Sequence, residues 1–285
     1  ASGGCPVWGG GGSLGRRRRR RRRDEGAARP VPRRAPPQRE GGTACIFAAP
    51  SSFVCRPHAP SALWPRRASL SPSTAAVAWR RDLDAIYDVN WMKATVAAHF
   101  ARELGDADMS DVLAFLTSTD GKRLVALEVS ARQAMSDASI EDAARSVYRA
   151  SGDASDARRD LVTTFISRNN MVAANVESAL HASFSYYRGL RESGALEMSD
   201  REIIEEVWAT EAETRSDTSE WLHAFLWMAY APLDNSVLAE YSALSATGAG
   251  QQMNKALFAS FDQMFAEIFY ALGLTTGQAL QTQNL

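Results

Sequence analysis

The residues best suited to chemistry are Glu220 and His223, which stand three positions apart in a segment predicted to be helical. This spacing places a carboxylate and an imidazole on one helix face, and di-iron bundles use a Glu-x-x-His motif from each of two helices, with two further Glu ligands. The nearest second pair, Glu177 and His181, is four apart. One hypothesis is therefore a metal-carboxylate enzyme centred on Glu220 and His223. The alternative is that Glu220 is a helix-start acid and His223 a partly buried polar residue.

Other catalytic patterns are missing from the sequence. It contains no P-loop, no G-x-G-x-x-G after a strand, no G-x-S-x-G and no H-E-x-x-H. Cys5, Cys45 and Cys55 form no C-x-x-C pair and all precede residue 82, so thiol catalysis is not expected in the rest of the chain. The sequence predicts no cofactor and favours a non-catalytic protein.

Charge divides the chain near residue 81. Residues 1–81 contain 17 Arg, no Lys and three acidic residues, whereas residues 82–285 contain 15 basic and 30 acidic residues. The first segment is rich in Arg, Pro, Gly and Ser and shows no lasting helical or strand period, so we expect it to be disordered or to be misassigned coding sequence. GC-rich DNA, which encodes such residues, seldom carries stop codons, and this favours misassignment.

The eight consecutive arginines at Arg16–Arg23 give a third functional hypothesis. If the tract is genuine, it predicts salt-sensitive binding to nucleic acid. The acidic remainder of the chain argues against nucleic-acid binding by the folded part.

No secretory signal is legible in the chain. Thr74–Ala78 ends in an Ala-x-Ala-like site, but no apolar segment of the usual ~7–15 residues lies directly upstream. The longest dense apolar run, Trp221–Pro232, is too short to span a bilayer, which takes ~20 residues. No transmembrane segment is expected.

Residues 82–273 are predicted to form an all-α multi-helix bundle. Apolar residues recur at spacings of three and four, and Pro232 is the single proline in this range. After the helices of 82–135, further helices are expected at about 139–151, 155–168, 171–192, 199–214, 217–230, 234–246 and 250–272. Gly273 is predicted to end the last of these, leaving 274–285 as a frayed tail.

Two segments resemble each other when Gly121 is aligned with Gly250. Residues 109–135 and 238–264 each contain a short helix, a Ser/Thr turn, a glycine and a longer helix. Phe115 then pairs with Leu244, and Lys122 with Gln251. Any two amphipathic helices align tolerably well, but the matched turn residues favour duplication of one helix–turn–helix unit.

The pattern from Phe115 to Lys122 resembles bacterial domain of unknown function family 2059, over about residues 82–273. In the second copy, from Leu244 to Gln251, leucine replaces the aromatic residue. The resemblance implies a helical protein exported by Gram-negative bacteria, hence periplasmic or secreted. We therefore expect a non-catalytic interaction or accessory protein of the cell envelope, with a possible protein partner there. The resemblance implies no reaction, ligand or cofactor.

Overall fold

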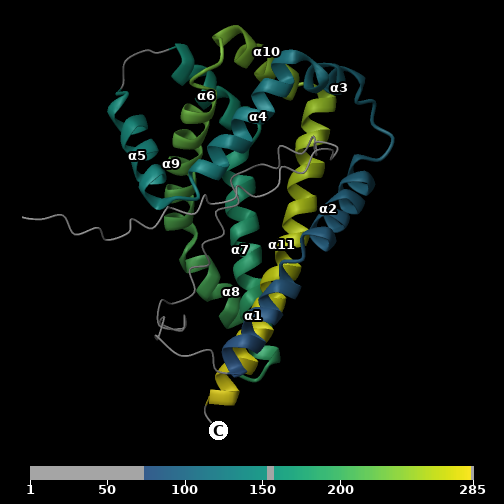
Figure 1. Ribbon diagram of the computed structural model, residues 1–285, viewed down its shortest axis with the longest axis vertical. Helices are drawn as coiled ribbons and strands as arrows, with labels where there is room; N and C mark the ends of the chain where they lie inside the picture. The colour runs from purple at the N-terminus through teal and green to yellow at the C-terminus, as the bar shows by residue number, and fades with distance from the viewer. Residues whose placement is uncertain (1–73, 153–156, 284–285) are drawn as a thin grey trace, which may run out of the picture. The chain divides into compact units, whose positions relative to one another are not determined.

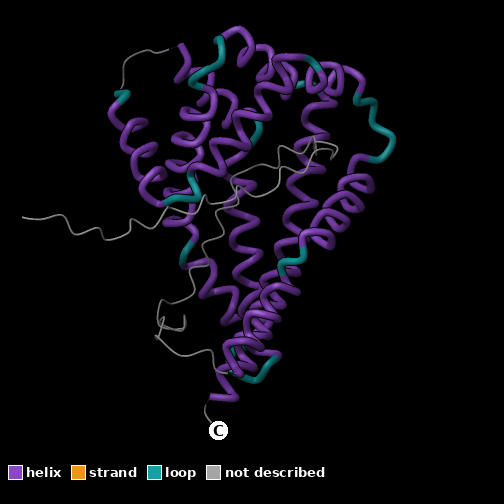
Figure 2. Tube along the Cα trace, viewed as in Figure 1, coloured by secondary structure: helices purple, strands orange, loops and turns teal. Residues whose placement is uncertain are grey.

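The computed structural model describes residues 74–152 and 157–283, which form helices joined by short connections (Figures 1 and 2). The helices are α1 (Thr74–Ile86), α2 (Val89–Leu104), α3 (Ser110–Thr117), α4 (Thr119–Ala134), α5 (Ala138–Ala150), α6 (Ala157–Arg168), α7 (Met171–Glu192), α8 (Asp200–Ala209), α9 (Glu211–Tyr230), α10 (Asn235–Ser245) and α11 (Gly248–Gln283). The described ranges contain no strand, which confirms the all-α prediction. None of their helices has both the length and the apolar composition to cross a membrane.

Some of the sequence predictions concern residues outside the described ranges. The Arg16–Arg23 tract, the three cysteines and residues 1–73 of the N-terminal segment lie outside the described ranges. Helix α1 begins at Thr74, eight residues before the predicted boundary at 82, so the Ala-x-Ala-like segment Thr74–Ala78 is helical.

The structure divides the first part of the described chain, and also the predicted helix 199–214, into separate helices. The Asp88 carboxylate accepts a 2.7 Å hydrogen bond from the backbone N–H of Trp91, so α2 begins as a separate helix after α1. The predicted helix 199–214 is also interrupted: the Thr210 hydroxyl donates to the Val207 carbonyl at 2.8 Å, and α9 starts at Glu211. A capping box at Ser199 and Glu202 fixes the start of α8.

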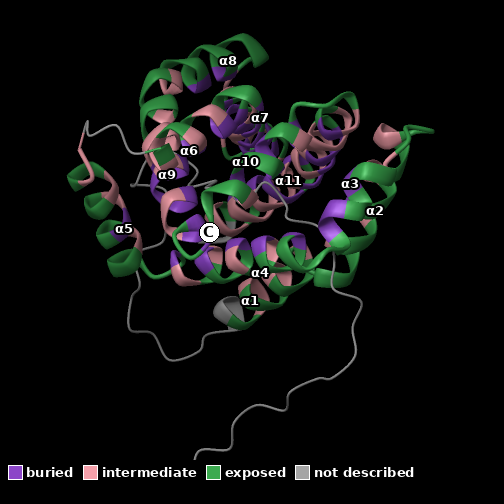
Figure 3. Ribbon diagram, turned by 90° about the horizontal axis from the view of Figure 1, so that it is seen from above, coloured by how far each residue is buried: buried purple, intermediate pink, exposed green. Residues whose placement is uncertain are grey.

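Two clusters of buried apolar side chains hold the helices together. Figure 3 colours the buried residues of each helix purple. The first joins α3, α4, α5, α6, α9, α10 and the start of α7, with Trp221, Phe225 and Tyr230 of α9 among its fully buried members. The second joins α2, α7, α8 and α11 through residues that include Ile203, Met264 and Ile268. Helix α9 thus lies at the centre of the first core, and the α7–α11 pair lies at the centre of the second.

Helix α11 packs closely along α7 because glycines face the partner backbone where they cross. A Cβ on Gly273 would overlap the carbonyl oxygen of Tyr186, and one on Gly189 would overlap that of Tyr270. Gly273 is therefore a contact position inside α11, and the prediction that it ends the helix is wrong. The predicted frayed tail is also wrong for 274–283, which continue the helix, and Gln281 Nε2 donates to the Ser193 carbonyl at 2.7 Å.

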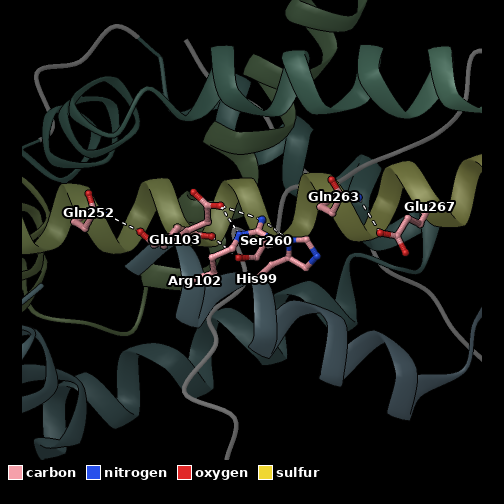
Figure 4. Close-up of polar contacts among 8 residues, drawn as sticks. His99, Arg102, Glu103, Gln252, Ser260, Gln263 and Glu267 are labelled. Carbon is pink, nitrogen blue, oxygen red and sulfur yellow. Dashed lines mark hydrogen bonds and ion pairs between the residues drawn. The ribbon is translucent and has the colours of Figure 1, made fainter. Parts of the chain in front are cut away.

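Helix α2 packs along α11 through apolar residues that include the buried Val96, and polar side chains add to this contact (Figure 4). Gln252 Nε2 donates a 2.7 Å hydrogen bond to the backbone carbonyl of Glu103 near the end of α2. On α2 itself, Arg102 contacts His99 at 2.8 Å and pairs with the Glu103 carboxylate at 3.0 Å. The Gln252–Glu103 hydrogen bond thus links the end of α2 to the last helix.

Candidate functional site

The six residues of the predicted family motif lie at two helix–helix turns with matching hydrogen bonds. In the α3–α4 turn, the Ser118 hydroxyl accepts from the Gly121 N–H at 3.1 Å, and the Ser118 N–H donates to the Phe115 carbonyl at 3.0 Å. In the α10–α11 turn, Thr247 makes the same two bonds, from the Gly250 N–H at 3.1 Å and to the Leu244 carbonyl at 3.0 Å.

Glycine is required at both turns because the following helix starts against the preceding one. A Cβ on Gly121 would overlap the Phe115 carbonyl oxygen, and one on Gly250 would overlap that of Leu244. Both glycines are buried. The glycines of the motif therefore serve close backbone packing.

Lys122 and Gln251 follow the two glycines and act differently. Their backbone N–H groups donate to the Ser118 and Thr247 carbonyls at 3.1 and 2.9 Å. The Lys122 side chain is exposed, whereas Gln251 Nε2 donates to the Ser245 carbonyl at 2.7 Å and closes the end of α10. The motif residues thus form two turns rather than one convergent site.

Glu220 lies in a small polar pocket of about 290 Å³ between α5 and α9. Arg145 lines this pocket and pairs with three acids: its guanidinium lies 3.0 Å from Glu141, 2.9 Å from Asp217 and 3.5 Å from Glu220. Arg149 adds a second contact to Glu220, at 3.4 Å. The Glu220 carboxylate is therefore a member of an ion-pair network that ties α5 to α9.

His223 lies beside this pocket and makes contacts of its own. Its Nδ1–H donates to the Ser219 carbonyl at 2.7 Å, and its ring stacks on Tyr148 with a centroid separation of 5.3 Å. Within the described ranges no three His, Cys, Asp or Glu side chains are grouped so that they could hold a metal ion. The structure therefore brings no third ligand to the predicted pair.

Glu128, which no sequence pattern singled out, is the one carboxyl side chain that is buried among the described residues. The Tyr230 hydroxyl donates a 2.5 Å hydrogen bond to its Oε1 across the α4–α9 contact. Loss of hydration raises the pKa of Glu128 to about 7, although the hydrogen bond from Tyr230 acts in the opposite direction. In the alignment of the two helix–turn–helix units, its counterpart is the apolar Leu257.

A wider, mostly apolar groove of about 530 Å³ lies between α7 and the α8–α9 segment. We call it the Trp208 groove. It is lined by Ala173, Val176, Glu177, Leu180, His181, Phe184, Ile204, Val207, Trp208, Glu211 and Arg215. Its two walls are presented by helices that the second core holds in place.

Helix α8 forms one wall because its apolar residues occupy two adjacent stripes. Ile203 and Val207 are buried against the second core. Ile204 and Trp208, one position further along, turn into the groove and keep 45% and 62% of their surface exposed. The capping box and the Thr210 turn stop α8 on both sides, and so they fix where this second stripe points.

Charged side chains border the groove. Arg215 pairs with Glu211 at 2.6 Å, and His181 Nδ1 lies 2.8 Å from Asp262 on α11. The Asp262 hydrogen bond is the main cause of a raised pKa at His181, and the charge of Glu177 acts in the same direction. The groove therefore combines an apolar floor with a border that carries charged side chains of both signs.

The part of the chain that matches a known protein family is the α2–α5 region. Residues 90–149 match the family of uncharacterised proteins conserved in bacteria known as domain of unknown function 2059. This is the family that the sequence resembled. The matched family segment runs from α2 to the end of α5 and contains the Phe115–Lys122 turn, Glu128 and Arg145. No curated protein and no solved structure matches the chain.

The family segment stops before the Trp208 groove. Helices α7, α8 and α9, which line the groove, all follow residue 149. The second turn, with Leu244, Gly250 and Gln251, also lies beyond it. The groove is therefore built by the part of this chain outside the family match.

Proposed function

We propose that the protein is a non-catalytic interaction protein of the bacterial cell envelope, and that it binds a protein partner at the Trp208 groove. The observation that carries this proposal is the 62% exposure of Trp208 beside an apolar groove. Tryptophan is enriched among the residues that dominate protein interfaces, because it buries a large apolar area on binding.

The contacts of Glu220 and His223 support the non-catalytic role. Arg145 and Arg149 engage the Glu220 carboxylate, and Ser219 and Tyr148 orient His223. Both side chains therefore have structural roles that account for their types and positions.

The proposed envelope location rests on the bacterial family match at residues 90–149 and on the resemblance to exported members of that family. Fractionation of cells that express the protein from its native locus tests it. We expect the protein in the periplasmic or secreted fraction. Recovery with the cytosol would contradict export while leaving the groove proposal intact.

Site-specific photo-cross-linking in those cells tests the groove. A photoreactive amino acid replaces Trp208, or Val129 as a control, since Val129 is 54% exposed on α4 outside the groove. We expect a discrete cross-linked adduct from position 208 and none from position 129. Equal adducts from both positions, or none from position 208, would contradict docking at the groove.

We also propose that the two helix–turn–helix units arose by duplication. Support comes from the hydrogen bonds of the two turns, which match one for one. Ser118 and Gly121 make the same bonds in the first turn as Thr247 and Gly250 make in the second. The burial pattern gives further support, because Met135 and Met264 occupy matched core positions. On this proposal the motif residues serve the packing of the two turns, and the binding function lies at the Trp208 groove.

A further inference from the structure

We infer that α4 and α5 form a pH-gated flap, which opens from α9 when the buried carboxyl of Glu128 loses its proton. The flap comprises residues Thr119–Ala150 and is independent of the Trp208 groove. Three features carry this inference: the way the two helices are attached, the surroundings of Glu128, and the apolar residue at the matching position of the second helix–turn–helix unit.

Helix α9 is the main anchor of the flap. Helix α4 packs mainly against α9 and α3, and α5 packs mainly against α9. The second core, which joins α2, α7, α8 and α11, includes no residue of α4 or α5. The flap can therefore leave α9 while the α7–α11 pair stays packed.

Apolar and polar contacts fasten the flap to α9. Leu124 of α4 and Ala144 of α5 are buried in the first core, at whose centre α9 lies. Arg145 on α5 pairs with Asp217 on α9 at 2.9 Å. Glu128 is buried in the same contact, so a change in its charge acts directly on the attachment.

Glu128 has a hydrogen-bond donor but no counterion at this contact. The Tyr230 hydroxyl donates to it at 2.5 Å, and no cation of the described ranges contributes to its pKa. The nearby cations bind other groups: Arg132 on α4 lies 4.9 Å from the centre of the Trp221 ring, and Arg158 on α6 donates to backbone carbonyls after α9.

The remaining neighbours of α4 also add no positive charge. Tyr241 of α10 lies near enough for the charge of Glu128 to raise the pKa of its hydroxyl. Asp111, the single ionisable residue of α3, is exposed. A carboxylate formed at Glu128 is thus a buried charge without a counterion, which is strongly unfavourable unless water reaches it. Since α4 covers Glu128 against α9, ionisation favours the open flap.

The second helix–turn–helix unit shows that packing at this position does not require a carboxyl. Leu257, the counterpart of Glu128, is equally buried, at 6% exposure. An apolar residue at this place gives a contact that does not respond to pH. Glu128 therefore adds a property that the matching unit lacks.

Hydrogen exchange of the full-length protein, read by mass spectrometry, tests the flap. After correction for the intrinsic pH dependence of exchange, amides of α4 and α5 should exchange about thirtyfold faster at about pH 8 than at about pH 5. Amides of α7 and α11 should show no such increase, because they belong to the second core. This comparison uses the wild-type chain, so it is decisive even if a variant fails to fold.

Two variants separate ionisation from packing. E128Q removes the titrating group and should abolish the pH-dependent increase, whereas E240Q, an exposed change on α10, should not. Y230F removes the hydrogen bond that favours the charged carboxyl. The increase levels off near pH 7 in the wild type and should therefore continue to higher pH in Y230F. Y187F, a matched change in the second core, should leave the wild-type profile.

His223 is a second group on α9 whose titration must be separated from that of Glu128, because histidine commonly changes charge between about pH 5 and 8. Its ring stacks on Tyr148 of α5, and its Nδ1–H donates to the Ser219 carbonyl. H223N keeps a donor for this carbonyl and should leave the increase intact.

The flap is refuted if exchange accelerates equally in α4, α5, α7 and α11, since that result indicates unfolding of the whole chain. No acceleration in the wild type would also overturn it. Acceleration that persists in full in E128Q, or that disappears in H223N, would assign the effect to another group and would contradict the role of Glu128.

Discussion

The Tyr230 hydroxyl and the Glu128 carboxyl form a 2.5 Å hydrogen bond in the core between α4 and α9. Burial of the pair raises the pKa of Glu128 to about 7 and holds the pKa of Tyr230 well above its ordinary value. This bond fastens the family segment to the helix at the centre of the first core. A carboxyl at this place links the stability of that contact to pH.

Stability should therefore fall as pH rises toward neutrality. The pKa of Glu128 is higher in the folded chain than its ordinary 4.5, so the unfolded chain releases the proton more readily. The contribution of Glu128 is complete below that ordinary value and is lost as pH rises through about 7. Urea unfolding should show a loss of roughly 2 kcal/mol from this group between about pH 5 and about pH 8.

The variant E128Q isolates this effect, because glutamine keeps an acceptor for Tyr230 but does not ionise. We expect a flatter pH dependence in E128Q and an unchanged one in E240Q. If E128Q keeps the full wild-type slope, Glu128 is not the responsible group.

His181 should titrate at a higher pH than an ordinary histidine, because Asp262 binds its protonated ring. The pair therefore stabilises the fold below the unfolded pKa of histidine, and this contribution is lost as pH rises through the raised value. NMR titration of the imidazole protons measures the shift directly. D262N should lower the pKa of His181, with E240Q as the control. An unchanged pKa in D262N would show that Asp262 does not hold the charge.

Alanine at Gly121 or Gly250 should destabilise the protein, although alanine usually favours a helix over glycine by ~1 kcal/mol. The added Cβ would overlap the carbonyl oxygen of the preceding helix in both turns. We expect each variant to lose at least ~2 kcal/mol of unfolding free energy. G248A is the matched control, since a Cβ there meets no atom within 4 Å. Thermal or urea unfolding of the three variants decides the point: similar stability for all of them would contradict the close-packing role.

Replacing Arg145 by alanine should weaken the α5–α9 contact. Its side chain is 11% exposed and lies among Glu141, Asp217 and Glu220, so R145A leaves several acids without their shared cation. The expected loss is about 2–3 kcal/mol. R201A removes a pair whose arginine is 87% exposed and should cost less than ~0.5 kcal/mol. Equal losses in urea unfolding of the two variants would show that the network adds no special stability.

Apolar periodicity was sufficient to predict the all-α fold and many of the helix bounds. The predicted helix 171–192 coincides with α7 because its apolar stripe is long and no cap interrupts it. The single helix predicted at 199–214 is divided at Thr210, where α8 ends and α9 begins. That break sets the position of Trp208, so the groove could not be predicted from periodicity alone.

Two further features depend on contacts between distant residues. Gly273 has the local signature of a helix end, but the Tyr186 backbone on α7 gives it a different role. Glu128 falls where the helical pattern allows either a surface or a core residue, and only the position of Tyr230 on α9 shows that it is buried. The two matching turns, by contrast, were visible in the sequence because Ser118 and Gly121, and likewise Thr247 and Gly250, are close neighbours along the chain.

Photo-cross-linking from position 208 in cells, repeated in an I204S background, tests the central claim most directly. Ile204 lies one helical turn from Trp208 on the same wall of the groove, and at 45% exposure it can be changed without opening the core. We predict an adduct at position 208 that I204S abolishes and that V147S, an exposed change on α5, leaves intact. An adduct that persists unchanged in I204S would contradict binding in the groove.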